Sequence, residues 1–422
     1  MKDGIFSDSE REALRARYED IKSKGYKLDL TRGKPGKRQL DLSMGMLSVV
    51  SSGEDCYSEA GVDCRNYGVL DGLPETKAIF AELLGVPSDN IIVAGNSSLN
   101  LMYDMVTRAM IFGVPGGERP WGEQKGIKFL CPVPGYDRHF SICEAFGIEM
   151  IPIRMNEDGP DMDIVEALVK TDERIKGIWC VPKFANPSGI TYSREVVERF
   201  AALTPRAPDF RIFWDNAYIV HSLYPDDPDP ADWNIFDEIK KYGREHENML
   251  YCFASTSKIT FPGSGVAILA ASGENIEYTK KVMSYQTIGH DKINQMRHVK
   301  YFGSAEGIRE HMRLHAELLR PKFEIVCGTL QRELGGLDIA KWSNPRGGYF
   351  VSLDVMPGCA MSVYELCREA GVALTPAGAT FPYGHDPNDS NLRIAPTFPE
   401  NDELQTAMDV LCLCVKLAAA EK

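Results

Sequence analysis

Lys258 is the residue whose setting in this sequence points most directly to chemistry. It follows an apolar run that ends at Ala254 and precedes a Pro-Gly-Ser-Gly turn and a second apolar run, Val266 to Ala271. This pattern predicts two buried strands joined by a loop that holds the lysine among hydroxyl side chains. Partial burial lowers the pKa of an ammonium and frees the amine to attack a carbonyl, which is the route to a Schiff base. Taken alone, however, the stretch fits a solvated lysine in a surface turn better, so the other elements must decide.

An acid and a phenol stand in a comparable setting at the end of another apolar run. Asp215 and Tyr218 follow the residues Ile212 to Trp214. A carboxylate beside a buried strand costs desolvation free energy unless a cation or a hydrogen-bond donor meets it. Catalysis and a structural ion pair with a nearby arginine explain Asp215 equally well.

A third candidate is the turn from Gly95 to Ser98. It lies between a short apolar strand that begins at Ile91 and a predicted helix over 99–112. Free amides and the helix dipole at such a turn favour an anion such as a phosphate. An ordinary helix cap by Asn96 or Ser97 is the simpler reading of the same turn.

The elements that position these residues alternate between strand and helix. The predicted strands are 127–132, 149–153, 177–181 and 211–215, and the predicted helices between them are 138–146, 161–170 and 193–203. Such alternation predicts an α/β fold with a mainly parallel sheet covered by helices on both faces. Ligands bind beyond the carboxyl ends of parallel strands, where four of the candidates fall: Ser97, Tyr136, Asn186 and Asp215.

The two ends of the chain predict a smaller α+β unit. A helix is expected over 7–25, capped by Ser7 or Ser9, and long helices are expected over 284–301 and 307–334. The last of these would bridge to strands that begin at Gly347 and Asn391.

Composition excludes several classes of protein. The chain has 422 residues and a formal net charge of -13, which disfavours nucleic acid as a partner because phosphate binding needs clustered cations. The 11 cysteines are odd in number and form no CxxC pair, as expected of reduced thiols. The first residues lack a signal-peptide core, and no apolar run reaches the roughly 18 residues that span a bilayer. We expect a soluble, cytoplasmic protein without a metal site.

The ordered motifs resemble a known family. They are Gly95-Asn-Ser-Ser98, Tyr136, Asn186-Pro-Ser-Gly189, Asp215-Asn-Ala-Tyr218, Ser255-Thr-Ser-Lys258 and Asn391-Leu-Arg393. In order and spacing they resemble the fold-type I pyridoxal phosphate (PLP) enzymes of aminotransferase class I/II, and most of all the bacterial type Ic aspartate aminotransferase-like branch. The resemblance covers nearly the whole chain. It implies a seven-stranded, mainly parallel sheet in a large domain, 50–305, and a small α+β domain formed by 1–49 and 306–422.

The resemblance assigns roles around the cofactor ring. Lys258 would hold PLP covalently and later move protons at the substrate Cα, and Asp215 would pair with the pyridinium nitrogen. Tyr218 and Asn186 would hydrogen-bond the ring hydroxyl. Two further side chains complete the implied ring contacts: Tyr136 stacked on the ring face and His139 behind Asp215.

The phosphate and the substrate receive their own implied partners. The phosphate would be held by Asn96, Ser97, Ser98, Ser255 and Ser257, and by Tyr67 from a neighbouring subunit, which implies a homodimer with shared active sites. Arg393 would bind the substrate α-carboxylate as a bidentate fork, beside Asn186 and Gly33. For a second substrate carboxylate the first candidate is Arg32, followed by Lys183 and Lys292. One position departs from most relatives, which carry a phosphate-binding arginine where this chain has Val266.

The predicted activity is therefore transfer of an amino group between an L-amino acid and a 2-oxo acid by ping-pong chemistry, with aspartate and 2-oxoglutarate favoured. An aminotransferase for aromatic or aminoadipate-like substrates, or a PLP β-lyase, is the alternative within the enzyme class. A non-catalytic ligand-sensing module is the remote alternative, because only about 25 residues precede the first predicted strand and a DNA-binding segment needs more.

Overall fold

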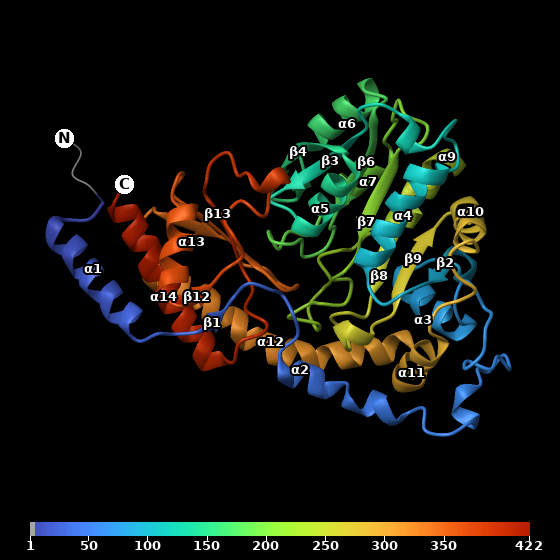
Figure 1. Ribbon diagram of the computed structural model, residues 1–422, viewed down its shortest axis with the longest axis horizontal. Helices are drawn as coiled ribbons and strands as arrows, with labels where there is room; N and C mark the ends of the chain where they lie inside the picture. The colour runs from blue at the N-terminus through green and yellow to red at the C-terminus, as the bar shows by residue number, and fades with distance from the viewer. Residues whose placement is uncertain (1–4) are drawn as a thin grey trace.

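The computed structural model describes residues 5–422, which form a large unit around an eight-stranded sheet and a small unit around two smaller sheets (Figure 1). The strand order of the large sheet is β2-β9-β8-β7-β6-β3-β4-β5. The strands are β2 (Ile91–Val93), β3 (Lys128–Val133), β4 (Glu149–Asn156), β5 (Gly159–Pro160), β6 (Ile175–Cys180), β7 (Arg211–Asp215), β8 (Leu250–Ser255) and β9 (Ala267–Ala271). Neighbours from β8 to β4 pair in parallel, β9 runs antiparallel to both its neighbours, and β5 is a two-residue antiparallel addition. The predicted seven-stranded, mainly parallel sheet is confirmed, with β5 as an eighth strand.

Helices cover both faces of this sheet because its strands are apolar on both sides. Side chains alternate between the two faces of a strand. On β7, Trp214 packs into one core with α3, α6, α7 and α8, whereas Phe213 packs into the other with α4, α5 and α10. The helices are α3 (Pro74–Leu84), α4 (Ser98–Phe112), α5 (Asp137–Phe146), α6 (Met162–Thr171), α7 (Arg194–Ala201), α8 (Ile235–Lys240), α9 (Arg244–Glu247) and α10 (Gly273–Met283).

The small unit combines both ends of the chain. It contains the antiparallel sheet β10-β11-β13 and the parallel pair β1-β12. Its strands are β1 (Leu28–Asp29), β10 (Ala340–Trp342), β11 (Val351–Val355), β12 (Val372–Ala373) and β13 (Asn391–Ile394). Its helices are α1 (Asp8–Ser23), α13 (Ala360–Glu369) and α14 (Asn401–Ala420). Ser7 caps α1, as predicted.

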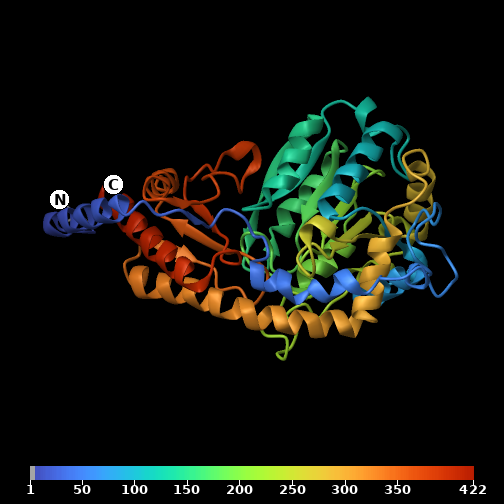
Figure 2. The ribbon, with the colours of Figure 1, turned by 60° about the horizontal axis from the view of Figure 1, so that its bottom comes forward.

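One helix joins the two units. α12 (Ala305–Leu334) extends along both, with α2 (Lys37–Leu42) beside it (Figure 2). Ile308 near its start packs into a core of the large unit, and Leu330 near its end packs into the core of the small unit. The predicted bridging helix is therefore confirmed.

The predicted helix over 284–301 is wrong. α10 ends at Met283, and α11 (Lys292–Phe302) begins after a separate turn. Asp291 caps α11 by accepting the amide of Asn294 at 2.9 Å. Gly289 lies so close to the carbonyl of Gly68 that an added Cβ would be 2.5 Å from that oxygen. Tertiary contact and the cap thus break a stretch whose composition alone favours one helix.

Within residues 5–422, no helix is both long and apolar enough to cross a membrane.

Candidate active site

A cavity of about 620 Å³ lies at the carboxyl edge of the parallel strands. Asp215 ends β7, Ser255 ends β8, Ser97 caps α4 and Tyr136 precedes α5, so each side chain is placed by the end of a regular element. The predicted residues that line the cavity are Arg32, Gly33, Ser97, Ser98, Tyr136, Asn186, Asp215, Tyr218, Ser255, Ser257, Lys258 and Arg393. The expectation that the sheet edge gathers Ser97, Tyr136, Asn186 and Asp215 is confirmed.

Lys258 lies half-buried in the loop between β8 and β9. Its Nζ is 5.0 Å from the ring centroid of Tyr218 and 6.0 Å from that of Tyr349. Burial lowers the pKa of Lys258, and the negative charge of Asp215 opposes this shift only in part. The predicted partly desolvated amine is therefore present, and a larger fraction of it is neutral at a given pH than for a solvated lysine.

Asp215 is 3% exposed, and only one of its two carboxylate oxygens has a hydrogen-bond partner. Its Oδ2 lies 3.2 Å from Nε2 of His139, whose ring stacks on Trp179 at 4.5 Å. Its Oδ1 is buried and has no hydrogen-bond partner among the described residues. A buried acceptor without a hydrogen-bond donor destabilises the fold by about 1–3 kcal/mol. A donor from outside the chain would remove this penalty at Oδ1. A protonated ring nitrogen of a cofactor is such a donor, and the residues present therefore fit PLP.

Arg393 is buried on β13 and reaches the cavity from the small unit. Its guanidinium donates to Oδ1 of Asp137 at 2.9 Å and to Oδ1 of Asn186 at 3.3 Å, and it lies over the ring of Phe350. Its Nε has no partner in the described part of the chain. A planar, partly unused guanidinium at this place suits a carboxylate ligand.

Tyr218 is a buried phenol beside the amine. Burial, reinforced by the charges of Tyr136 and Asp215, raises its pKa well above the usual value. Burial likewise raises the pKa of Tyr136 to about 12. Both side chains are therefore neutral hydrogen-bond donors at neutral pH.

Hydroxyl groups collect at the amino end of α4. Ser97 accepts the amide of Asn100, and the hydroxyl of Ser255 donates to that of Ser257 at 3.2 Å. Ser257 also donates to the main-chain carbonyl of Asn96. Asn96 itself does not line the cavity, so its contribution is that of its backbone. Hydroxyls at the positive end of a helix form an anion site.

Val266 points away from this anion site. It is 2% exposed, packs into a core of the large unit and donates its amide to the hydroxyl of Thr256. No cation can reach the cavity from that position without rebuilding the core.

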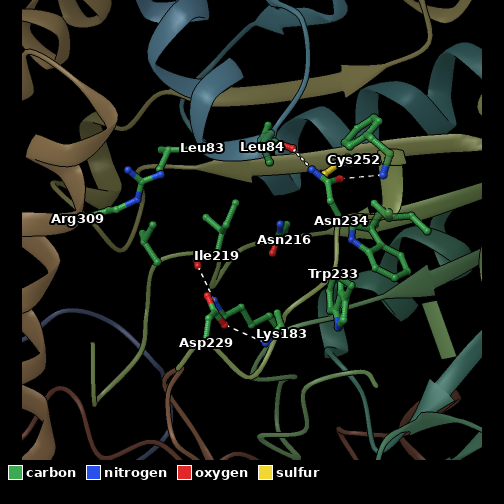
Figure 3. Close-up of a pocket in the computed structure, with 15 residues that line it drawn as sticks. Leu83, Leu84, Lys183, Asn216, Ile219, Asp229, Trp233, Asn234, Cys252 and Arg309 are labelled. Atoms are coloured by element: carbon green, nitrogen blue, oxygen red, sulfur yellow. Dashed lines mark hydrogen bonds and ion pairs between the residues drawn. The ribbon is translucent and has the colours of Figure 1, made fainter. Parts of the chain in front are cut away.

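Two other candidate cations for the second carboxylate, Lys183 and Lys292, lie outside the main cavity. Lys183 lines a second cavity of about 200 Å³, where it pairs with Asp229 at 2.6 Å and donates to the carbonyl of Ile219 (Figure 3). Lys292 donates to the carbonyl of Gly68. Neither lines the main cavity of its own chain, unlike Arg32, the first candidate for the second carboxylate. Their partners are distant in sequence, and no local pattern showed them.

The sequence reasoning also missed a cation. Arg138 lines the cavity beside Arg32 and Lys34. Within residues 5–422, neither Arg138 nor Arg32 has an ion-pair partner. Its place two residues after Tyr136, at the same sheet edge, was the signal that could have found it. Tyr67, in contrast, is 83% exposed and outside the cavity of its own chain.

The fold is that of the fold-type I PLP-dependent aminotransferases. An α-aminoadipate aminotransferase from Thermus thermophilus, solved with N-(5'-phosphopyridoxyl)-L-leucine, superposes with a TM-score of 0.76. The alignment covers 99% of this chain and 100% of that chain at 19% identity, so it shows the fold alone.

The family follows from closer matches. Residues 3–422 match the model of the aspartate amino-transferase family, and the chain belongs to that family. It is 47% identical to an aspartate aminotransferase of Corynebacterium glutamicum over 410 residues, 97% of this chain and 94% of that protein. The crystal structure of an aspartate transaminase from Corynebacterium glutamicum superposes with a TM-score of 0.94 at 45% identity, covering 100% of this chain and 99% of that chain. These matches confirm the predicted enzyme class, a PLP-dependent aminotransferase.

Proposed function

We propose that this enzyme moves an amino group between aspartate and 2-oxoglutarate, with PLP bound in the 620 Å³ cavity. The observation that carries the proposal is the unmet Oδ1 of buried Asp215 in the same cavity as a half-buried lysine of lowered pKa. An acid left in this state stabilises a positively charged ring nitrogen. The 47% identity to an aspartate aminotransferase of Corynebacterium glutamicum supports the choice of aspartate.

Each part of the cofactor has proposed partners in the cavity. When bound, PLP supplies a carbonyl that amino groups condense with and a ring that accepts electrons. Lys258 would hold it covalently, and Asp215 would meet its ring nitrogen. The remaining proposed contacts are Asn186 and Tyr218 at the ring hydroxyl, Tyr136 at the ring face, Ser97, Ser98, Ser255 and Ser257 at the phosphate, and His139 behind Asp215.

The chain's own side chains would then handle the proton and the carboxylate. The neutral amine of Lys258 takes a proton from the substrate Cα and returns one at the acceptor, so no separate acid–base pair is needed. Arg393 holds the α-carboxylate and thereby orients the Cα–H bond. Tyr218 stays protonated, because its pKa is raised, and donates a hydrogen bond.

The second carboxylate of aspartate needs its own cation. Arg32 and Arg138 both line the cavity, and neither is spent on an ion pair within residues 5–422. An unpaired arginine can bind a carboxylate without first breaking another contact. We therefore place the side-chain carboxylate between these two residues and keep Gly33 as the backbone that lets the substrate approach.

The proposal includes the assembly and the domains. A homodimer would let the exposed Tyr67 reach the phosphate in the partner's cavity. We keep 50–305 as the large domain and 1–49 with 306–422 as the small domain, because most residues of the large-unit cores fall in the first range and most of the small-unit core in the second. Ile308 and Tyr218 pack across this division.

Replacing the lysine tests the function. Lys258→Ala with added PLP should lose the absorbance of the lysine-bound cofactor and lower kcat with aspartate and 2-oxoglutarate by at least about a thousandfold. Retention of that absorbance band would contradict the role of Lys258. Assays of the wild-type enzyme with aromatic donors and 2-aminoadipate would show whether aspartate is preferred, and pyruvate and ammonia formed without an acceptor would indicate a β-lyase instead.

A further inference from the structure

A connected set of buried polar side chains lies behind the catalytic loop. Tyr349 donates its hydroxyl to the main-chain carbonyl of Lys258 at 3.3 Å. Gln39 donates its amide to the oxygen of Tyr349 at 3.0 Å and lies 3.1 Å from Nδ1 of His315. These three side chains are 2% exposed or less. Buried polar networks of this kind rigidify a site only if every member is satisfied.

The partners determine which atom donates in each bond. The amide of Gly36 donates to Oε1 of Gln39 at 3.0 Å, so the side-chain nitrogen of Gln39 must face Tyr349 and His315. Both hydrogens of that nitrogen are then used, and the hydroxyl of Tyr349 is free to donate to Lys258. Nδ1 of His315 must accept, which requires a neutral ring.

The charge state of His315 agrees with this requirement. Burial, reinforced by the neighbouring His311, lowers the pKa of His315 to about 3. The imidazole is therefore neutral at neutral pH, and the direction of the hydrogen bonds does not change in the working range of an enzyme.

The same network continues to a second histidine on the bridging helix. Because Nδ1 of His315 accepts, Nε2 of His315 carries the ring hydrogen and donates to Nε2 of His311 at 3.2 Å. His311 and His315 stand on one face of α12, four residues apart. The carbonyl of Lys258 is thus hydrogen-bonded to a buried network anchored on the bridging helix.

The other end of the network leads back to the substrate cavity. Gln39 lies on α2, which packs beside α12 (Figure 2). Its partner Gly36 is two residues after Lys34, the last of the residues Arg32, Gly33 and Lys34 that line the cavity. The substrate-facing segment 32–36 and the main chain of Lys258 are therefore joined through two side chains.

We propose that Gln39 and Tyr349 are positioning residues that hold the main chain of Lys258 in a fixed position relative to segment 32–36. This inference deepens the proposed function and rests on it. Neither side chain lines the cavity, so each acts through the lysine and not on the substrate. Because they form one chain of hydrogen bonds, breaking either bond should have the same consequence as breaking both.

The test is a double-mutant cycle on the PLP-loaded enzyme. Gln39→Leu and the milder Tyr349→Phe should each lower kcat about tenfold while KM for aspartate changes by less than about twofold, since each breaks the path of hydrogen bonds to Lys258 and neither removes a substrate contact. The double variant should be no worse than the poorer single variant. Losses that multiply would overturn the proposal, as would wild-type kcat in both single variants.

Two control variants separate positioning from a general loss of structure. Tyr18→Phe removes a phenol that donates to the carbonyl of Leu366 at 3.0 Å, and Gln405→Leu removes an amide bonded to Thr329, both within the small unit. Each should keep kcat within about twofold of wild type. An equal loss of kcat in these controls would mean that Gln39 and Tyr349 are merely structural.

A readout without cofactor completes the test. In the apoprotein, hydrogen exchange of the 256–260 amides should speed up in Gln39→Leu and in Tyr349→Phe but not in the controls. Unchanged exchange there would refute the coupling. If the wild-type enzyme transfers no amino group while this exchange pattern holds, the proposed function fails and the connection between Gln39 and the loop stands.

Discussion

The two ends of strand β7 carry buried acids that differ in one respect. Asp209, just before the strand at the amino edge of the sheet, pairs with Lys176 at 2.6 Å through one oxygen and with Gln124 at 2.9 Å through the other. Asp215, at the carboxyl edge, meets His139 through one oxygen and nothing through the other. Both acids are almost fully buried. Burial and charge therefore do not distinguish the two acids, whereas the unmet oxygen of Asp215 does.

The largest effect should come from removing the acid at the carboxyl edge. Asp215→Ala should lower kcat about a thousandfold or more, because the positive ring nitrogen of the cofactor loses its partner in a low dielectric. The apoprotein should remain about as stable as wild type, since the lost side chain had one oxygen unmet. Steady-state kinetics and thermal unfolding of the apoprotein measure the two quantities. A large loss of stability would mean that Asp215 is as structural as Asp209.

The matching change at the amino edge should affect stability and spare the chemistry. Asp209→Ala leaves Lys176 buried and unpaired, which should cost about 3–5 kcal/mol of unfolding free energy. The variant should keep kcat within about threefold of wild type at a temperature where it is folded. Urea unfolding monitored by circular dichroism gives the free energy. If kcat falls as far as in Asp215→Ala, the contrast between the two edges is not one of function and structure.

Arginines at the two edges offer a smaller comparison. Arg138→Gln should lower kcat/KM for aspartate about tenfold to a hundredfold and leave a donor with an uncharged side chain almost unaffected. Arg174→Gln is the matched control, because Arg174 lies at the amino-edge cavity and is paired with Asp172 at 2.7 Å. Arg174→Gln should change kcat/KM neither for aspartate nor for the donor with an uncharged side chain. Equal losses for charged and uncharged donors would exclude Arg138 as a reader of the second carboxylate, and Arg32→Gln would then be tested in the same way.

The smallest effect concerns the pH dependence of stability. The pKa of Lys258 is lowered in the folded apoprotein, so the unfolded chain binds more protons between the folded and the unfolded pKa. Burying the charged Lys258 therefore lowers the free energy of unfolding of the apoprotein at neutral pH. This destabilisation disappears as the pH rises through that interval. Lys258→Met should be more stable than wild type at neutral pH, and the difference should shrink toward pH of about 10. Thermal unfolding of both apoproteins over this range checks the sign, which a constant difference would contradict.

Much of the fold could be predicted because its determinants are local. Apolar runs such as the one ending at Asp215, followed by helical periodicity, place the strand ends on one edge. The strand–loop–strand setting of Lys258 follows from the same kind of pattern. The helix predicted over 284–301 failed because its break depends on Gly289 packing against Gly68, a contact between segments far apart in the chain.

The candidate site divides in the same way. Residue types and order were enough to nominate Lys258, Asp215 and Arg393, since their chemistry is intrinsic to the side chains. Placement at the carboxyl edge of the sheet favours Lys183, which follows β6, as much as Arg138; only the fold pairs Lys183 with Asp229 and leaves Arg138 free to face the cavity.

By itself, then, the sequence determined which chemical groups stand at the ends of which elements, because periodicity and turn residues act over a few neighbours. Only the tertiary structure decided which of those groups are satisfied. The unmet oxygen of Asp215 and the bond from Gln39 through Tyr349 to Lys258 depend on segments as far apart as 310 residues. A hydrogen bond forms or fails within a few tenths of an ångström, and that precision exists only once the packed backbone brings both partners together.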